Sequence, residues 1–316
     1  MSLPKFVCIV AIVLLTHSNG TKSQYTSMNH QENENTSAVA PSMHSEILAD
    51  SDFQFLVTGG YRPETNNLVK YLVGLHRSKG NIQFGDSYFC EGSIIAKRVI
   101  LTAGHCMFEE YVKFKPSDIF VVAGTPKRLV KTDSTQIMKV KSLKVHPRFS
   151  RVGSLTNDLA LLILEKEISM GNFTDTIPIT NHTPEAGLNC TVVGWGTVLP
   201  EGPLPDEVVY GDVQIQPRSF CKKLQGFRSD VMICACSPLN YEVDSCQGDS
   251  GGPMICNEKV YGIVSFGDGC GEPNNAGIYT NVYRFRKWIE RNSRSENVKQ
   301  LSLVLLLLII HTQLVL

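Results

Sequence analysis

Three short segments of the sequence carry residue types that could perform nucleophilic catalysis. Ser250 lies in Gly-Asp-Ser-Gly-Gly-Pro, a glycine-rich turn that can hold a hydroxyl away from the backbone. A serine hydroxyl is too weakly acidic to attack an amide without a base and a group that orients this base. His105 in Ala-Gly-His-Cys and Asp158 in Thr-Asn-Asp-Leu-Ala could supply these two parts. The three segments therefore predict a Ser-His-Asp triad that hydrolyses an amide through an acyl-enzyme.

The chain order His, Asp, Ser and the residues around each resemble the trypsin/chymotrypsin-like serine endopeptidases. The resemblance covers residues 57–292 and implies an all-β fold, in which the active site lies in the cleft between two six-stranded antiparallel β-barrels. It implies an oxyanion hole formed by the backbone N–H groups of Gly248 and Ser250. It also implies a zymogen, in which the carboxylate of Asp249 pairs with the α-ammonium of Val57 after cleavage.

The same resemblance implies a specificity pocket with Asp244 as its floor. A carboxylate there would pair with Arg or Lys of the substrate, whereas an apolar side chain would leave its charge unpaired. Glycine at the wall positions 267 and 277 leaves room for a long side chain, and the segment 265–267 would pair with extended substrate. The residues implied to bind substrate are Asp244, Ser245, Ser265, Phe266, Gly267 and Gly277. We therefore expect cleavage after Arg or Lys.

Short β-rich runs separated by Gly, Pro and Asn predict the elements that position these residues. The predicted strands are 71–76, 99–102, 119–123, 138–146, 159–164, 191–194, 208–216, 259–266 and 277–281. An amphipathic pattern predicts a C-terminal helix over 282–292. With barrels at about 57–165 and 170–281, the base and its aspartate would come from the first barrel and the nucleophile from the second.

Nine cysteines remain once Cys8, in a predicted signal peptide, is set aside. This density indicates disulfides in an oxidising compartment, although spacing alone does not give their connectivity. The pairings implied by the resemblance are Cys90 with Cys106, Cys190 with Cys256, Cys221 with Cys234, and Cys246 with Cys270. Cys236 is left over. We interpret it as a buried, inert thiol; the alternatives are a reactive free thiol and a bond to another chain.

The ends of the chain differ in composition from the rest. Residues 1–20 predict a secretory signal peptide, whose ten-residue apolar run is too short to span a bilayer. Residues 21–56 are polar and predict a disordered propeptide. Residues 293–316 form a polar spacer and a hydrophobic tail that resemble a lipid-anchor signal, with a short membrane span as the alternative. We therefore expect a protein that is secreted or anchored to the outer cell surface, with glycosylation acceptors at Asn35, Asn172, Asn181 and Asn189.

The predicted activation site departs from the family pattern. Family zymogens are cut after Arg or Lys, but Leu56 precedes Val57 here, and no Lys or Arg occurs between Ser23 and Tyr61. We therefore expect an activating protease of non-basic specificity, one that cleaves after Phe or Leu. The alternative is a latent zymogen, or a non-catalytic homologue that acts as a binding or regulatory protein.

Charge and metal-ligand patterns exclude several other functions. The 30 basic and 30 acidic residues balance, so the net charge gives no reason to expect a nucleic-acid partner. Residues 124–136 contain only Asp133 as a carboxylate, so we expect no structural calcium, and no cofactor is implied. We expect polypeptide substrates and protein inhibitors as partners. Seven basic residues are interpreted as a solvated basic face, with an exosite that binds polyanions as the alternative. They are Lys127, Arg128, Lys131, Lys139, Lys141, Lys144 and Arg148.

Overall fold

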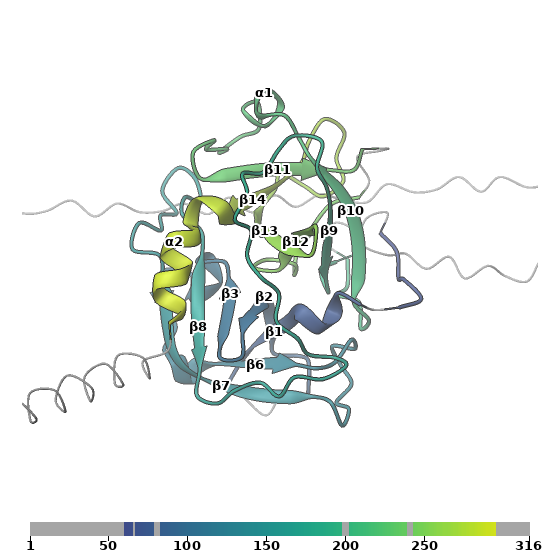
Figure 1. Cartoon of the computed structure of the whole chain (residues 1–316), viewed down its shortest axis with the longest axis vertical. Helices are drawn as coiled ribbons and strands as arrows, with labels where there is room; N and C mark the ends of the chain where they lie inside the picture. The colour runs from purple at the N-terminus through teal and green to yellow at the C-terminus, as the bar shows by residue number, and fades with distance from the viewer. Residues whose placement is uncertain (1–59, 66, 79–82, 198–201, 239–242, 295–316) are drawn as a thin grey trace, which may run out of the picture. The chain divides into compact units, whose positions relative to one another are not determined.

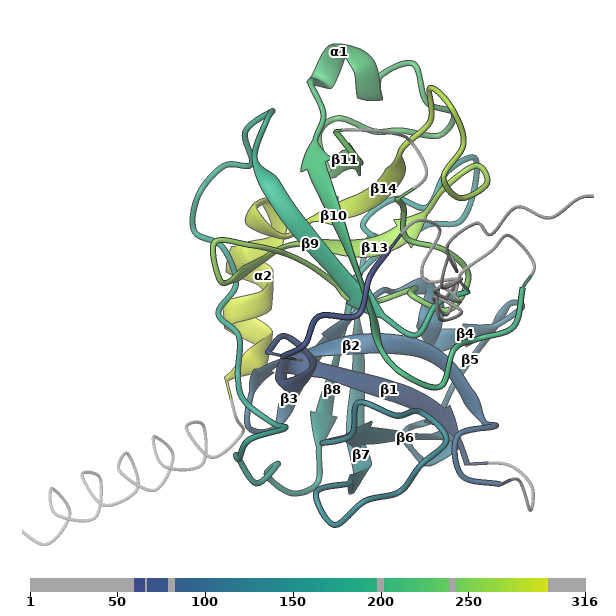
Figure 2. The same ribbon diagram turned by 90° about the vertical axis from the view of Figure 1, so that its right-hand side faces the viewer.

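The computed structural model describes residues 60–294, except 66, 79–82, 198–201 and 239–242. All of these residues belong to one compact unit, Asp52–Leu316. Two closed antiparallel barrels dominate it, one below the other in Figure 1 and again in Figure 2. The all-β, two-barrel fold expected from the sequence is therefore confirmed.

The first barrel has the strand order β1-β2-β3-β8-β7-β6. Its strands are β1 (Leu72–Arg77), β2 (Tyr88–Ala96), β3 (Val99–Thr102), β6 (Ile119–Ala123), β7 (Gln136–Val145) and β8 (Ala160–Leu164). Apolar side chains such as Ile94, Leu101 and Leu161 are fully buried in its core. A two-stranded hairpin of β4 (Phe108–Glu109) and β5 (Val112–Lys113) follows β3.

The second barrel has the strand order β10-β11-β14-β13-β12-β9. Its strands are β9 (Asn189–Gly194), β10 (Val209–Ile215), β11 (Met232–Cys236), β12 (Pro253–Cys256), β13 (Lys259–Phe266) and β14 (Gly277–Asn281). A one-turn helix, α1 (Arg218–Cys221), lies between β10 and β11. Each barrel thus has the six strands that the resemblance implies.

Three barrel strands were not predicted from the sequence, each for a physical reason. In β2, Glu91 and Gly92 interrupt the apolar pattern, although both residues are buried. Strand β11 is a run of five buried residues, which has no alternation to mark it as a strand. Strand β12 has only four residues and directly follows the glycine-rich turn.

The C-terminal helix α2 (Val282–Ser293) ends one residue later than predicted. Asn281 caps it by accepting the N–H of Arg284 at 3.2 Å, and its apolar face is buried through Phe285 and Ile289. The ring of His146, just after β7, packs 5.1 Å from the rings of Phe285 and Trp288. The helix follows the second barrel in sequence and packs against strands of both barrels, β8 of the first and β13 of the second.

Four disulfides join Cys90 to Cys106, Cys190 to Cys256, Cys221 to Cys234, and Cys246 to Cys270. These are the pairings that the resemblance implies. Cys236 is the free cysteine of the described residues and is buried, which agrees with its interpretation as a buried thiol. Burial, and to a lesser degree the charge of Asp244, raises the pKa of Cys236 to about 11, so the thiolate needed for reaction is scarce near neutral pH.

The predicted signal peptide (1–20), propeptide (21–56), Val57 and Asn35 lie outside the described residues, as does the tail beyond Arg294. Ser293, the first residue of the predicted spacer, is the last residue of α2. Within the described segments, no helix is both long and apolar enough to cross a membrane.

Candidate active site

His105 and Asp158 lie together in the first barrel. His105 begins a single 3-10 turn (His105–Met107) after β3, and Asp158 directly precedes Leu159 and β8. The Nδ1 atom of His105 lies 2.8 Å from Oδ2 of Asp158, and the His105 backbone N–H donates to Oδ1 at 2.7 Å. Gly104 allows this approach, because a Cβ there would lie 3.2 Å from Asp158 Oδ1. The pair has the geometry of a base held by an aspartate.

The carboxylate of Asp158 is fully buried, yet its charge is stabilised. Burial alone would raise its pKa, but His105 and a hydrogen bond from Ser265 lower the pKa below its usual value. The Ser265 hydroxyl donates to Asp158 Oδ2 at 2.6 Å, and the Thr280 hydroxyl donates to the Asp158 carbonyl at 2.7 Å. Both hydroxyls come from the second barrel. The sequence analysis assigned Ser265 only to substrate binding and missed Thr280, because neither contact follows from a local pattern.

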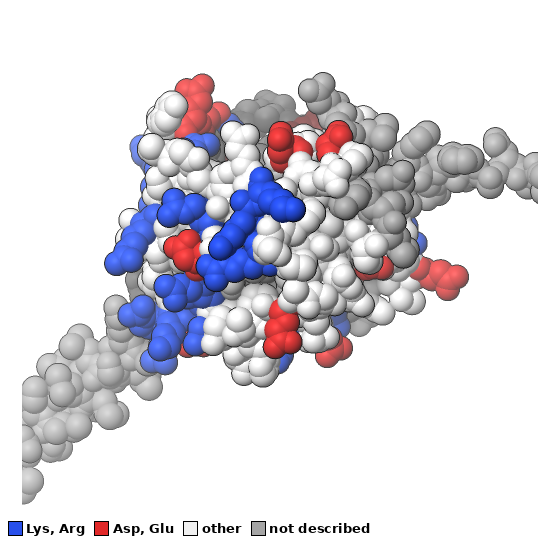
Figure 3. Space-filling model, turned by 90° about the horizontal axis from the view of Figure 1, so that it is seen from above, with Lys and Arg blue, Asp and Glu red and all other residues white. Residues whose placement is uncertain are grey.

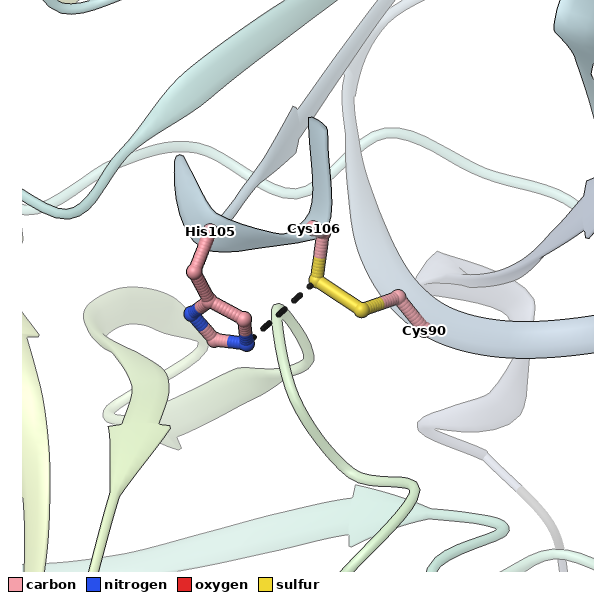
Figure 4. Close-up of side chains that lie close together, drawn as sticks. All are labelled: Cys90, His105 and Cys106. Carbon is pink, nitrogen blue, oxygen red and sulfur yellow. Dashed lines mark hydrogen bonds between the residues drawn. A yellow bond between two sulfur atoms is a disulfide. The ribbon is translucent and has the colours of Figure 1, made fainter. Parts of the chain in front are cut away.

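A disulfide lies beside the imidazole, as Figure 4 shows. Nε2 of His105 is 3.7 Å from Sγ of Cys106, and Cys106 is bonded to Cys90. These three residues place their N and S atoms within 4.8 Å of one another. Because the two sulfur atoms are bonded to each other, they are not the thiolates that a metal ion would need. The cluster is therefore a structural support for the loop of His105.

Ser250 lies in a turn that only glycine can form at two points. Gly248 has φ +109° and Gly251 has φ +85°, both in the left-handed region. A Cβ on Gly251 would also overlap the Thr102 side chain. The Ser250 carbonyl accepts the N–H of Glu91 in β2 at 2.8 Å, which ties this turn of the second barrel to the first.

Ser250 and His105 are neighbours across the barrel interface. The Ser250 carbonyl oxygen is 3.6 Å from Sγ of Cys106, the atom that also contacts the imidazole. Among the described residues, the Ser250 hydroxyl has no hydrogen-bond partner, His105 included. Such bonds often tighten only when substrate binds, so this geometry is compatible with a triad.

A cavity of about 160 Å³ lies beside Ser250. Its lining consists of Ser245, Cys246, Gln247, Ser250, Val264, Ser265, Phe266, Gly267, Gly269 and Cys270. Four of the six predicted substrate-binding residues thus line it, and the Cys246–Cys270 disulfide joins two of its sides. Larger hollows of about 550 and 480 Å³ lie elsewhere, and no predicted catalytic residue lines them.

The other two predicted pocket residues, Asp244 and Gly277, lie behind this lining. A Cβ on Gly277 would come 2.6 Å from Oδ1 of Asp244. Asp244 is 4% exposed and accepts the backbone N–H of Ser245 at 2.8 Å. Burial raises the pKa of Asp244 to about 7. Among the described residues, no Lys or Arg forms a salt bridge with it. A buried acid without a salt-bridge partner among the described residues thus lies next to Ser245 of the cavity lining.

Asp249 is a second buried acid of the same turn. Its Oδ1 accepts the N–H of Gly196 at 2.7 Å, and its Oδ2 accepts the N–H of Cys246 at 2.9 Å. Burial raises the pKa of Asp249 to about 6, in spite of these two hydrogen bonds. Val57, its predicted partner, lies outside the described residues.

Three residues of the predicted basic face contact other groups of the protein. Lys127 pairs with Glu207 at 2.8 Å, Arg128 donates to the carbonyl of Gly85 at 3.1 Å, and Lys144 donates to a carbonyl near the end of α2 at 2.9 Å. Seen from above, Lys and Arg side chains of the described residues gather toward the left-hand side of the view in Figure 3, which identifies none of them individually. A hollow beside α2 has basic lining residues Arg148, Arg284, Lys287 and Arg291.

The three predicted glycosylation acceptors among the described residues, Asn172, Asn181 and Asn189, are all exposed. Asn189 lies at the start of β9, and its side-chain oxygen accepts a hydrogen bond from Gln214 at 3.0 Å. Exposure satisfies the steric requirement for a glycan at each position.

Comparison with known proteins adds a separate observation. Residues 57–289 match the sequence model of the family described as Trypsin. The chain is 33% identical to Serine protease 1 of Homo sapiens over 247 residues, which cover 77% of this chain and 92% of that protein. It is 31% identical to Trypsin epsilon of Drosophila erecta over 243 residues (75% and 88%). It is 34% identical to Kallikrein-8 of Homo sapiens over 212 residues (66% and 78%). The similarity extends over both barrels.

Proposed function

Because the chain belongs to the trypsin family of serine proteases and is a serine endopeptidase, we propose that His105, Asp158 and Ser250 are its catalytic triad and that it cleaves after Arg or Lys. The observation that carries this proposal is the juxtaposition of three features. The imidazole of His105 lies 2.8 Å from Asp158, Ser250 lies beside it, and the adjoining cavity is backed by the buried acid Asp244.

In the proposed reaction, the Ser250 hydroxyl attacks the scissile carbonyl while Nε2 of His105 takes its proton. The backbone N–H groups of Gly248 and Ser250 stabilise the oxyanion that forms. His105 then gives the proton to the leaving amine, and the acyl-enzyme remains on Ser250. Water, deprotonated by the same imidazole, hydrolyses the acyl-enzyme and restores the serine.

Asp158 has two tasks in this scheme. It holds the proton of His105 on Nδ1, so that Nε2 is free to accept the serine proton, and it stabilises the imidazolium. The hydrogen bond from Ser265 supports both tasks because, together with His105, it lowers the pKa of the carboxylate despite full burial. Ser265 is therefore a positioning residue for the triad as well as part of the pocket wall.

The buried acid behind the pocket supports basic specificity. A substrate guanidinium or ammonium would offset the desolvation of Asp244, whereas an apolar side chain would leave the acid without a charge partner. Gly267 and Gly277 add no side chain to the pocket wall, and the main chain near Phe266 is available to extended substrate. The substrates are therefore polypeptides with Arg or Lys before the scissile bond.

Binding of a cationic inhibitor is expected to weaken as pH falls below about 7. Burial raises the pKa of Asp244 to about 7, so below that pH a cation must displace a proton from the acid. The dissociation constant of benzamidine should rise about tenfold per pH unit between pH 7 and pH 5. Calorimetric titration across this range measures it. In the Asp244→Asn variant, binding should be weak and should lose this dependence; an equally steep dependence there would assign it to another group.

We further propose that the protein is secreted as a zymogen and glycosylated at exposed acceptors, with the C-terminal tail as a lipid-anchor signal. Activation would release Val57, and its α-ammonium would pair with Asp249. The four disulfides and the exposure of Asn172 support an extracellular protein. Protein inhibitors that present Arg or Lys to the pocket are expected partners.

Trypsin is expected not to activate the precursor, because no Lys or Arg lies between Ser23 and Tyr61. A protease that cleaves after Leu or Phe should instead produce Val57 as the N-terminal residue, and hydrolysis of an Arg-containing peptide should begin with that cleavage. N-terminal sequencing alongside the hydrolysis assay measures both. Activity after trypsin treatment with a Val57 N-terminus would refute the expected activator class.

The rival function is a non-catalytic homologue that binds partners without cleaving them. The experiment that separates the two is labelling of the Val57 form with a fluorophosphonate, which reacts with an activated serine. Labelling at Ser250 together with hydrolysis after Arg or Lys supports the protease. A chain with the Val57 N-terminus that is neither labelled nor active supports the rival.

A further inference from the structure

A second acid, Glu91, is fully buried next to Asp249. It lies in the middle of β2 and has no exposed surface. Its Oε1 accepts the backbone N–H of Trp195 at 2.6 Å and the hydroxyl of Tyr88 at 2.7 Å. Its Oε2 is buried and has no hydrogen-bond partner among the described residues. A buried carboxylate oxygen without a partner is costly, which suggests that a group outside the described residues binds it.

Glu91 and Asp249 lie close together beside Gly194. A Cβ built on Gly194 would overlap Oδ1 of Asp249 and would lie 2.6 Å from Oε2 of Glu91. A Cβ on Gly252 would overlap the same Oε2 atom. The two carboxylates can therefore lie this close to each other and to the main chain because both neighbours are glycines.

No salt bridge from a Lys or Arg of the described residues reaches either acid. Arg128 lies over the ring of Tyr88, 5.6 Å from its centroid, and donates to main-chain carbonyls, while His76 packs on another side of that ring. Burial, and then the charge of Asp249, raises the pKa of Glu91 well above its usual value. Two buried acids so close together favour a bound cation.

The chain entering the structure lies within reach of these two acids. Tyr61 pairs with Tyr210 in β10, with backbone hydrogen bonds of 2.9 Å in both directions, and Tyr210 lies opposite Val193 in β9. Val193 precedes Gly194, so Tyr61 is two strand spacings, about 10 Å, from the strand beside both acids. Val57 is four residues upstream and can extend about 13 Å. Its α-amine can therefore reach the two carboxylates.

We propose that Glu91 is a second carboxylate of the site that binds the α-ammonium of Val57, so that the new N-terminus inserts between Glu91 and Asp249. This inference rests on the proposed activation at Val57. Glu91 is a positioning residue, because it acts through the turn that carries Ser250 and does not touch the substrate. Insertion displaces a proton from the pair of acids, and the two charges together hold the ammonium more strongly than Asp249 alone.

The second charge is expected to extend activity to higher pH. A free α-amine has a pKa of about 8. Two carboxylates raise that pKa in the inserted state, so insertion is lost only as pH rises through the raised pKa. Glu91→Gln removes one charge but keeps an oxygen that can accept from Trp195 and Tyr88. The alkaline midpoint, the pH at which half of the activity is lost on the alkaline side, should then fall by about one unit. The reason is that the inserted α-ammonium loses its proton about tenfold more readily.

The experiment uses full precursors that carry Leu56→Arg, so that immobilised trypsin can expose Val57 and then be removed. Three chains are compared: the Leu56→Arg parent, the same chain with Glu91→Gln, and a control with Glu167→Gln, an exposed acid. Hydrolysis of an Arg peptide from pH 7 to 11 gives the alkaline midpoint. Acetylation of the α-amine, followed by mass spectrometry, gives its protection independently of activity. Only the Glu91→Gln chain should show a lower midpoint and faster acetylation.

Equal midpoints and equal acetylation rates in the parent and the Glu91→Gln chain would overturn the inference, while their activity would still support the proposed protease. Inactivity of all three chains would instead count against the proposed function, and acetylation would still test the inference. Glu91→Asp keeps the charge on a shorter side chain and should recover most of the parent's protection. If it behaves like Glu91→Gln, the charge of Glu91 is not what binds the amine.

Discussion

Ser250→Ala is expected to lower kcat by about 10⁶-fold without unfolding the protein. The Ser250 hydroxyl is the atom proposed to form the acyl-enzyme, so its removal leaves only binding and oxyanion stabilisation. Because this hydroxyl has no hydrogen-bond partner among the described residues and the side chain is only partly buried, its loss should cost little stability. Steady-state hydrolysis of an Arg peptide and a thermal unfolding curve measure the two effects.

A matched control is Ser229→Ala, which removes a partly buried serine hydroxyl remote from the site, where it accepts from Arg218 at 2.6 Å. Its activity should equal that of the parent. His105→Ala should be about as damaging as Ser250→Ala, and the double variant hardly worse, because the two residues act as a unit. A fall of less than tenfold for Ser250→Ala would remove Ser250 from the proposed triad.

Asp244→Asn is expected to lower kcat/KM for Arg and Lys substrates by about 10²–10⁴-fold, since a buried ion pair that loses one partner costs about 3–5 kcal/mol. The amide keeps the shape of the side chain but cannot supply the charge. Activity toward a Leu or Phe peptide, which does not use that charge, should fall far less. Comparison of the two substrate classes on the same variant measures the specificity change. Equal losses on both classes would indicate damage to the pocket instead of a lost charge.

The same substitution should raise stability near neutral pH. Burial raises the pKa of Asp244 to about 7, against about 3.9 in an unfolded chain. For an acid whose pKa is raised by folding, stability is full below the unfolded pKa and is lost as pH rises through the folded pKa. The parent should therefore lose about 3 kcal/mol between pH 4 and pH 7 from this group, and Asp244→Asn should not. Denaturant unfolding at both pH values measures this difference.

Short local motifs indicated the candidate site residues whose roles depend on their immediate neighbours in sequence. His105 and Ser250 each lie in a short segment whose residues are needed at that place, such as the glycines that free the turn of Ser250. The contact of Ser265 with Asp158 could not be predicted in this way, because it joins residues 107 apart in sequence. Such a contact depends on how the two barrels pack against each other, and a local sequence pattern does not determine that packing.

Strand prediction succeeded where apolar residues alternate or cluster, as in β3, β6, β13 and β14, whose bounds were predicted correctly. It failed in β2, where Glu91 and Gly92 interrupt the apolar pattern although both are buried. Glu91 is both the reason for this failure and the centre of the further inference. A polar residue that breaks a strand pattern is thus a place to look for a site.

The hydroxyls of Ser265 and Thr280 hold Asp158 from across the barrel interface, and this has a consequence for how the protein can be altered. The two barrels are not exchangeable modules, since a chimaera that takes one barrel from a relative inherits only half of the hydrogen bonds that orient the aspartate. Each half could fold correctly and the hybrid would still be a poor enzyme. Activity in this protein therefore reports the alignment of its two halves, and recombination or domain grafting should keep all three residues together.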